Sequence, residues 1–266
     1  MANNIENQEE EVTKLENNKS EVKGPFDIIG DIHGCYEELC DLLEKLGYQV
    51  NRFQEAVSSP QHRIVVFLGD LVDRGPKSPE VLKLVMSMVK NKEALCVMGN
   101  HDGKLLRKLK GGNVQVLHGL QETLDQLEKE STAFKEEVKI FLEHLVSHYV
   151  LDEGKLVVAH AGLREKYHGM VSKKIRDLAM FGETTGKLDA LGLPMRIDWA
   201  SSYAGRALVV YGHTPRAQAV IVNNTLNIDT GCVFGGKLTA FRYPEMTLVE
   251  VQAKSVYCTP VRPFLD

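Results

Sequence analysis

The 266-residue chain is long enough for one large domain or two small ones, and its composition, 43% hydrophobic and 26% charged, is that of a globular protein. Its formal net charge of -4 argues against binding along extended nucleic acids, which requires a basic surface. The five cysteines show no CxxC spacing, so we expect buried, reduced thiols of a cytoplasmic protein. No apolar run of 18 residues and no signal peptide is visible, so we expect neither a membrane span nor export.

Residues 1–23 differ in composition from the rest of the chain. They hold six glutamates and five asparagines among few apolar residues. Such a segment cannot bury enough apolar surface to offset its loss of conformational entropy on folding. We therefore predict a disordered acidic tail over residues 1–23 and a folded domain over residues 24–266.

The first half of the domain alternates apolar strands with amphipathic helices. Strands are expected at 26–29, 63–68 and 94–98, and helices at 36–46 and 78–90 lie between them. Because strand and helix alternate and the strands are almost continuously apolar, the pattern predicts a central sheet that is largely parallel.

The second half is first helical and then rich in strands. Helices are expected at 102–110, 117–129 and 134–150. Strands are expected at 155–159, 207–211, 217–222, 226–228, 237–242 and 247–252. Residues 164–205 show no regular pattern and are expected to form a rim over a site. No repeat or linker divides the chain, so we predict one α/β domain of two packed, mixed β-sheets flanked by helices.

Five apolar strands each end in a short polar segment that contains glycine. The segments are Gly30–Gly34, Gly69–Gly75, Gly99–Asp102, His160–Gly162 and Gly212–Thr214. The carboxyl ends of strands in an open α/β sheet form a ligand crevice, so the five segments can converge there. Together they offer two aspartates, three histidines and one asparagine, namely Asp31, Asp70, His33, His160, His213 and Asn100.

Each of these residues has an ordinary explanation when it is considered alone. Asp31 could cap the following helix, and a single buried histidine is more often hydrogen-bonded than metal-bound. Their recurrence at five strand ends has no packing rationale, so we interpret the set as a metal centre. Carboxylate, imidazole and amide ligands suit manganese, iron or zinc, and a carboxylate that bridges two ions is typical of two-metal hydrolytic sites.

In these motifs the chain resembles the calcineurin-like, PPP-type metallophosphoesterases, and the match covers nearly everything after the tail. The resemblance implies the calcineurin-like metallophosphoesterase fold and two divalent ions, with Mn²⁺ favoured over Fe, Zn or Ni. It implies that Asp31 and His33 hold the first ion and that Asp70 bridges the two. The second ion would be completed by Asn100, His160 and His213.

The resemblance also implies catalytic roles. His101 would be the general acid, Asp73 would orient it, and Arg74 would bind the phosphate. Asp102 stands where protein phosphatases of the family have glutamate, a difference that bears on the subfamily. Among the cations in and after the irregular segment, Arg196 and Arg206 are the favoured further contacts to the substrate.

Four longer segments resemble two bacterial groups within this family. One is the phosphatase module of bacterial polynucleotide kinase–phosphatase, an RNA-repair enzyme, and the other is the asymmetric bis(5′-nucleosyl)-tetraphosphatase. The segments are Phe26–Tyr36, Gly182–Gly186, Val209–Pro215 and Asn227–Gly235. In both groups the aspartate at the position of Asp229 belongs to the site, so we expect Asp229 beside a ligating histidine. The absence of kinase and ligase modules favours the tetraphosphatase.

Two other functions stay open, a protein serine/threonine phosphatase and, in a different class, a non-catalytic metal-binding scaffold. A kinase is excluded, because residues 231–237 fit the GxxxxGK pattern but Leu238 replaces the serine or threonine and a strand follows. We expect a metal-dependent phosphohydrolase whose substrate is a phosphorylated small molecule, such as a nucleotide, or a nucleic-acid end. The sequence does not indicate an oligomeric state.

Overall fold

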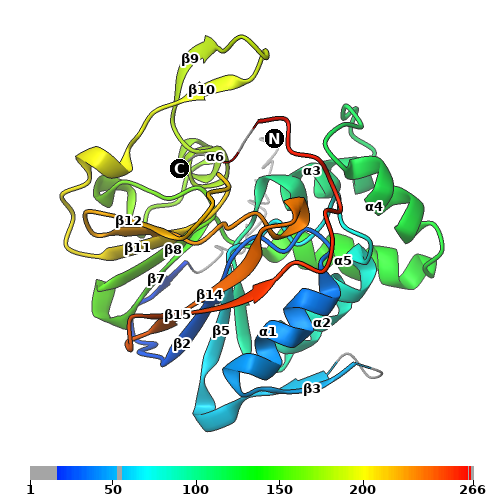
Figure 1. Cartoon of the computed structure of the whole chain (residues 1–266), viewed down its shortest axis with the longest axis horizontal. Helices are drawn as coiled ribbons and strands as arrows, with labels where there is room; N and C mark the ends of the chain where they lie inside the picture. Colours follow the sequence, from blue (N-terminus) through cyan, green and yellow to red (C-terminus); the bar gives the residue numbers. More distant parts are fainter. Residues whose placement is uncertain (1–16, 53–55, 263, 265–266) are drawn as a thin grey trace, which may run out of the picture.

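A computed structural model describes residues 17–52, 56–262 and 264. Two β-sheets pack against each other, and helices α1 (Tyr36–Leu46) and α2 (Ser78–Lys90) cover the outer face of one of them (Figure 1). The predicted pair of mixed sheets flanked by helices is confirmed.

The five-stranded sheet carries the first half of the domain at its centre. Its strand order is β15-β14-β2-β5-β6. The bounds are β2 Phe26–Ile29, β5 Ile64–Phe67, β6 Ala94–Cys96, β14 Lys237–Tyr243 and β15 Thr247–Gln252. Strands β2, β5 and β6 are parallel, as predicted, whereas β14 pairs with β2 in the antiparallel direction.

The six-stranded sheet has the order β1-β7-β8-β11-β13-β12. Its strands are β1 Asn18–Lys19, β7 His148–Leu151, β8 Leu156–Ala159, β11 Leu208–Tyr211, β12 Val220–Val222 and β13 Thr225–Asn227. Strands β8, β11 and β13 are parallel, so the residues that follow β8 and β11 meet at one edge. Two small hairpins pair β3 Gln49–Asn51 with β4 Ala56–Ser58, and β9 Thr184–Leu188 with β10 Pro194–Arg196.

Four further α-helices complete the described part of the chain, and short 3₁₀ turns join some of the elements. The helices are α3 Asn100–Leu109, α4 Leu120–Leu127, α5 Thr132–His144 and α6 Lys173–Phe181. Helix α1 ends as predicted, because Gly47 adopts the left-handed conformation that terminates helices, with φ of 98°.

The core has two layers, and the strands of the five-stranded sheet are buried on both faces. Ile28 points into the layer between the sheets, where it packs with Val158 and Val210, whereas its neighbour Ile29 points into the layer beneath α1 and α2. Burial of both faces explains why the strand is apolar at consecutive positions. The packing gives the strand ends a rigid base.

Two of the predicted elements are wrong in their extent. The helix predicted over residues 134–150 ends at His144, because the next apolar run, residues 148–151, is fully buried as strand β7. The segment 164–205 is less irregular than predicted, since it contains α6 and the β9–β10 hairpin. The hairpin could not be read from a burial pattern, because every residue of β9 and β10 is exposed.

The folded region also begins earlier than residue 24. Strand β1 pairs with β7, the backbone N–H of Val150 donates to the carbonyl of Asn17 at 3.0 Å, and Val22 packs against the layer between the sheets. Residues 17–23 are therefore part of the sheet edge. The rest of the predicted tail, residues 1–16, lies outside the described residues.

All five cysteines are free thiols, and four of them are buried, as expected. Among the described residues, no helix is both long enough and apolar enough to cross a membrane.

Candidate metal centre

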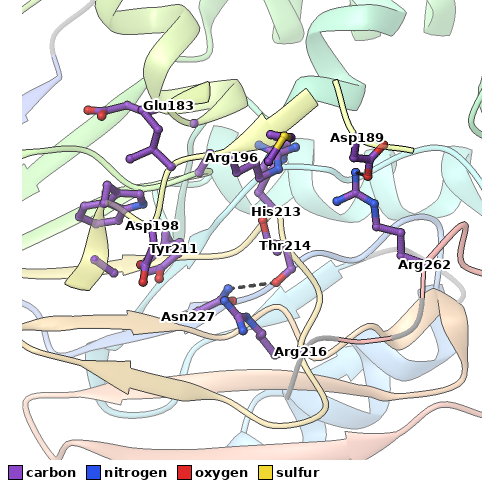
Figure 2. Close-up of a pocket in the computed structure, with 16 residues that line it drawn as sticks. Glu183, Asp189, Arg196, Asp198, Tyr211, His213, Thr214, Arg216, Asn227 and Arg262 are labelled. Atoms are coloured by element: carbon purple, nitrogen blue, oxygen red, sulfur yellow. Dashed lines mark hydrogen bonds and ion pairs between the residues drawn. The ribbon is translucent and has the colours of Figure 1, made fainter. Parts of the chain in front are cut away.

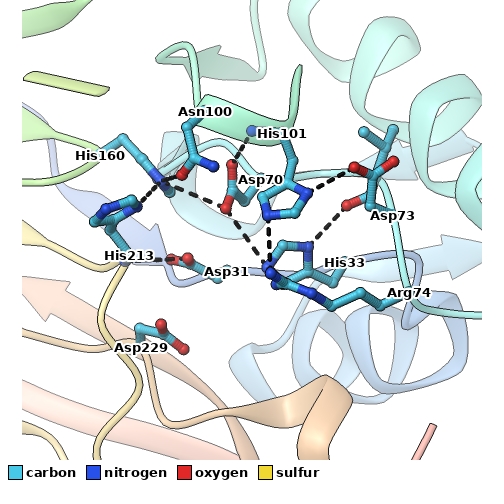
Figure 3. A network of polar contacts seen from close by, with 12 residues as sticks. Asp31, His33, Asp70, Asp73, Arg74, Asn100, His101, His160, His213 and Asp229 are labelled. Carbon is cyan, nitrogen blue, oxygen red and sulfur yellow. Dashed lines mark hydrogen bonds and ion pairs between the residues drawn. The ribbon is translucent and has the colours of Figure 1, made fainter. Parts of the chain in front are cut away.

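The polar segments converge where the strands of both sheets end. Asp31 and His33 follow β2, Asp70 follows β5 and Asn100 follows β6, while His160 and His213 follow β8 and β11. Figure 3 shows these side chains facing one another in a single cluster. The sequence predicted this convergence.

Five residues at the cluster have strained backbones. His33, Asp70, Asp73, Arg74 and His213 have φ values of 49°, 49°, 74°, 72° and 70°, in the left-handed region. Such a conformation costs about 1–3 kcal/mol for a residue other than glycine, and it persists where surrounding contacts enforce it. The strain turns each side chain toward the centre.

Glycines permit the closest approaches. A Cβ atom on Gly212 would lie 2.0 Å from Oδ1 of Asp31, and one on Gly99 would lie 2.3 Å from Oδ1 of Asp70. No side chain fits at these two positions, so the backbone itself forms part of the wall around the carboxylates.

Backbone carbonyls fix the tautomers of two histidines. Nδ1 of His160 lies 2.9 Å from the carbonyl of Leu68, and Nδ1 of His33 lies 2.8 Å from that of Val72. A carbonyl only accepts, so each Nδ1 carries the proton and each Nε2 presents a lone pair. Donation of the distal N–H to a backbone carbonyl is the arrangement that orients histidine ligands of metals.

Arg74 donates to Nε2 of His33, and the lone pairs of both histidines also face other acceptors. Nε2 of His160 lies 3.0 Å from Oδ1 of Asn100 and 3.4 Å from Oδ2 of Asp70, and Nε2 of His33 lies 3.5 Å from the same Oδ2. His213 places Nδ1 3.0 Å from Nε2 of His160, while its own Nε2 is buried without a hydrogen-bond partner among the described residues. Converging acceptors of this kind need a cation between them, so the donor set fits divalent metal ions.

The directions in which burial shifts the pKa values of the cluster agree with a metal site. Burial lowers the pKa of His160 to about 3 and that of His33 and His213 well below the usual value, so the imidazoles are neutral. Burial raises the pKa of Asp70 to about 7, and the positive charge of Arg74 offsets this effect only in part. Bound metal ions would supply the missing positive charge and stabilise the ionised carboxylate.

Asp70 lies at the middle of the cluster. Within this cluster, possible ligand atoms form two groups within 4.8 Å, one of His33, Asp70 and His101 and the other of Asp70, His160 and His213, and Asp70 is common to both. Its backbone is held from behind by Asp102, whose carboxylate accepts the N–H groups of Asp70 at 2.7 Å and Leu71 at 2.9 Å. Asp102, which stands where the resemblance to protein phosphatases leads one to expect glutamate, thus positions the carboxylate of Asp70.

His101, Asp73 and Arg74 form a second small network beside the cluster. Nδ1 of His101 lies 2.6 Å from Oδ2 of Asp73, so it donates its proton there, and Nε2 faces the cavity, where Nη2 of Arg74 donates to it at 2.9 Å. Nη1 of Arg74 lies 2.6 Å from Nε2 of His33. The guanidinium therefore lies in front of the centre, where an anion would bind.

Two expected aspartates lie at the edge of the cluster. Asp31 accepts the backbone N–H of His213, with Oδ2 at 3.0 Å, and belongs to neither group of close ligand atoms. Asp229 raises the pKa of Asp31 by its charge, after the larger effect of burial. Among the described residues, no hydrogen bond joins Asp229 to a histidine, and its Oδ1 accepts from Gly231 instead. Asp229 and His213 line the same cavity, and a role of Asp229 beside a ligating histidine stays a prediction.

The two additional arginines have different positions. Arg196 lines both cavities that adjoin the cluster. Arg206 precedes β11, at the opposite end of the strand from His213, and lines neither cavity. The prediction for Arg206 is wrong, because a residue just before a strand lies one strand length from the carboxyl edge.

Sequence reasoning missed several residues around the site. Arg262 lines both cavities, Arg216 lines the first and Phe234 lines the second, with the Arg74 guanidinium 5.2 Å from its ring centroid. Phe234 follows the Asp229 motif and could have been suspected from it. The sequence around Arg262 contains no motif that indicates a site residue, because the fold of the C-terminal segment brings Arg262 to the site.

A family model for calcineurin-like phosphoesterases matches residues 24–248, which is most of the chain. This chain belongs to the calcineurin-like phosphoesterase family. As a metallophosphoesterase, it is a metal-dependent hydrolase that acts on phosphate compounds. The identity of the metal is not fixed by this membership.

This metallophosphoesterase is similar along nearly its whole length to proteins named bis(5′-nucleosyl)-tetraphosphatase PrpE [asymmetrical]. The protein of Anoxybacillus flavithermus is 46% identical over 90% of this chain and 99% of its own. That of Bacillus subtilis is 45% identical over 87% of this chain and 96% of its own. These relatives show which branch of the family the chain resembles.

Solved structures agree with the fold. A crystal structure of a candidate diadenosine tetraphosphatase has a TM-score of 0.63 and 26% identity, over 89% of this chain and 96% of the other. A protein serine/threonine phosphatase from Saccharomyces cerevisiae has a TM-score of 0.58 at 15% identity, over 87% of this chain and 80% of the other. The second likeness shows a shared fold only.

Proposed function

We propose that this metallophosphoesterase hydrolyses bis(5′-nucleosyl)-tetraphosphates asymmetrically, giving one product with one phosphate and one with three. The observation that carries the proposal is the similarity, at about 45% identity over nearly the whole chain, to relatives named for this activity. The structure supports it with a cluster of acceptors suited to divalent cations and with arginines beside that cluster. The proposed catalytic domain comprises residues 24–266, as predicted, together with residues 17–23, which pair with the sheet edge.

In this proposal the six predicted ligands hold two divalent ions, with manganese as the favoured metal. Asp31 and His33 would hold one ion, Asn100, His160 and His213 would hold the other, and Asp70 would contribute to both. Bound there, the ions would act as Lewis acids toward the phosphate and would lower the pKa of a water molecule. The neutral tautomers of His33 and His160 are already set by the backbone for this role.

The remaining groups bind the substrate and carry a proton. The Arg74 guanidinium lies where it can bind non-bridging oxygens of the phosphate that is attacked. In the reaction the oxygen of water forms a bond to phosphorus, a bridging P–O bond breaks, and one proton of the water passes to solvent. Nε2 of His101 accepts from Arg74 in this structure, so to act as the acid it first takes up a proton from solvent and then gives that proton to the departing oxygen. Asp73 holds the ring in the required orientation through Nδ1.

A substrate panel tests the proposal. The wild-type protein with Mn²⁺ is compared on diadenosine tetraphosphate, a 2′,3′-cyclic nucleotide, an RNA 3′-phosphate end and a phosphothreonine peptide, with products resolved by chromatography. We expect the highest kcat/KM on the tetraphosphate, with AMP and ATP as products. A higher value on the peptide would identify a protein phosphatase, and two molecules of ADP from the tetraphosphate would contradict asymmetric cleavage.

We also propose that the protein is cytoplasmic and that its substrate is a small molecule. Five unpaired thiols suit a reducing compartment, and the acidic net charge suits a small anion bound in a pocket better than a long polyanion bound along a surface.

A further inference from the structure

Two cavities adjoin the metal centre and share one wall. The first has a volume of about 400 Å³ and lies between the β9–β10 hairpin, Trp199 and the end of β11. The second has a volume of about 360 Å³ and is lined by four residues of the metal cluster, namely His33, Asp70, Asn100 and His213. Four residues line both cavities, namely Arg196, His213, Thr214 and Arg262. A molecule bound at the metal centre can therefore extend past His213 into the first cavity.

The first cavity changes in character along its length. Figure 2 shows Tyr211 and Asp198 on one side of His213 and Arg262 on the other. Two of the arginines, Arg196 and Arg262, lie toward the metal centre, since they also line the cavity that adjoins it. The end farther from Arg196 and Arg262 holds Trp199, Tyr211 and Asp198, and Arg216 lines the same cavity. Positive charge next to the centre and an aromatic, acidic end beyond it match the two parts of a nucleoside phosphate.

The aromatic end is rigid. The indole of Trp199 lies against Gly162, where an added Cβ would be only 2.0 Å from Cζ2 of the ring. Its centroid is 5.1 Å from that of Tyr211, with an angle of 59° between the planes, and 5.8 Å from that of Tyr203. Trp199 is only 7% exposed, so it supports the wall, whereas Tyr211 is half-buried and offers more of its ring to the cavity.

The opposite side of the cavity is the β9–β10 hairpin. Its base places Arg196 in both cavities, and an ion pair between Asp189 of the hairpin turn and Arg262 links it to the C-terminal segment. Met195 and Ile197 line the first cavity although they are 43% and 38% exposed. Exposed apolar side chains around a cavity provide a surface that a flat ligand can cover.

We propose that the first cavity binds one nucleoside of the substrate, with its base on the ring of Tyr211 and its hydroxyl groups donating to the carboxylate of Asp198. Arg196 and Arg262 bind the phosphates between this nucleoside and the metal centre. The proposal rests on the function proposed above and deepens it, because it names the surface that distinguishes a nucleotide from other phosphate compounds. Its volume is within the range of small-molecule sites.

Direct binding provides the first test, because Trp199 is the only tryptophan in the chain and is part of the cavity wall. AMP is titrated into the Mn²⁺-loaded protein while tryptophan emission is recorded, and inorganic phosphate is titrated in parallel. We expect a saturable change with AMP that inorganic phosphate does not produce. The same change with both ligands, or none with AMP, would overturn the proposal.

Kinetics of variants provide the second test. Tyr211→Leu should lower kcat/KM on diadenosine tetraphosphate by about tenfold or more, as expected for the loss of one base–aromatic stack, mostly through KM. Asp198→Asn should act in the same direction, and Tyr211→Phe, which keeps the ring, should restore most of the activity. The loss should be much smaller on p-nitrophenyl phosphate, which has no nucleoside. Asp177→Asn, on the exposed face of α6 and outside both cavities, is the matched control.

The outcomes separate the two proposals. If the wild-type protein prefers the phosphopeptide, the proposed function fails before the variants are compared. If it prefers the tetraphosphate and Tyr211→Leu behaves like Asp177→Asn, only the nucleoside site fails. Equal losses on the tetraphosphate and on p-nitrophenyl phosphate would show a structural role for Tyr211 and would also overturn the site.

Discussion

His148 should make the stability of this protein depend on pH in a way that can be isolated. Its Nε2 accepts the backbone N–H of Gly169 at 3.0 Å and lies 3.1 Å from Nδ2 of Asn17, while its Nδ1 lies 3.0 Å from Oγ of Ser147. Because Nε2 accepts, the fold holds the neutral ring with its proton on Nδ1. Burial lowers the pKa of His148 from 6.5 to about 4, with a smaller effect from His168.

The sign of the effect follows from these two pKa values. The unfolded chain takes up the proton near pH 6.5, whereas the folded chain resists it until about pH 4. The contribution to stability is therefore fully present above the unfolded pKa and is lost as the pH falls through this window. Linkage gives a loss of about 2 kcal/mol at pH 5 and about 3 kcal/mol at pH 4, relative to a residue that does not titrate.

The matched variant is His148→Gln, whose amide oxygen can accept from Gly169 and which does not titrate. Urea unfolding of both proteins is followed by the emission of Trp199, with a chelator present, at about pH 7.5 and about pH 5. Other titrating groups are the same in both proteins, so the difference between them isolates His148. We expect the free energy of unfolding to shift in favour of the variant by about 2 kcal/mol between these pH values. An unchanged difference would refute the reasoning.

Three further predictions concern the centre and the N-terminal segment. Asp70→Asn should remove bound metal as well as activity, so metal content measured after desalting should fall by more than half, and retention of full occupancy would contradict the bridging role. His101→Ala should slow hydrolysis of an alkyl phosphate ester, which has a poor leaving group, about 10²–10⁴-fold but that of p-nitrophenyl phosphate far less; equal losses would argue against a general acid. Removal of residues 1–23 should lower Tm by about 6–12 °C, since three backbone hydrogen bonds worth about 1 kcal/mol each are lost, whereas removal of residues 1–16 should leave Tm unchanged.

The local sequence pattern was sufficient to predict much of the fold and the residues of the metal centre. Helices α1 and α2 begin and end at the predicted residues, because apolar spacing and Gly47 or Ser78-Pro79 define them within a few positions. The six predicted ligands follow five buried strands, and the parallel packing of those strands brings them together without further information. The residues that follow a buried strand can be predicted as site residues from the local sequence, because the rigid strand determines where its end lies.

Elements held by distant contacts were not predictable in this way. Strand β1 is two residues long and forms by pairing with β7, and Val150 of β7, more than 130 residues away, donates to the carbonyl of Asn17 just before it. The β9–β10 hairpin buries no face, so it has no alternation to detect. Arg206 was predicted at the site because it lies close in sequence to a site strand, yet it precedes that strand, whereas Arg262 enters the site from the other end of the chain.

The predictable residues are those of the metal centre, and the unpredictable ones are those around the substrate. The metal centre requires fixed geometry, so its residues stand on the ends of buried strands, and even strained backbones such as those of Asp70 and His213 are held there by the core. Recognition of the substrate requires contacts beyond the scissile phosphate, and the segments placed there are the exposed hairpin and the C-terminal residues around Arg262. Such segments can change sequence without disturbing the strands, which lets one hydrolytic centre serve different phosphate compounds. The substrate of this chain should therefore be determined by Tyr211, Asp198 and the arginines around His213 rather than by the metal ligands.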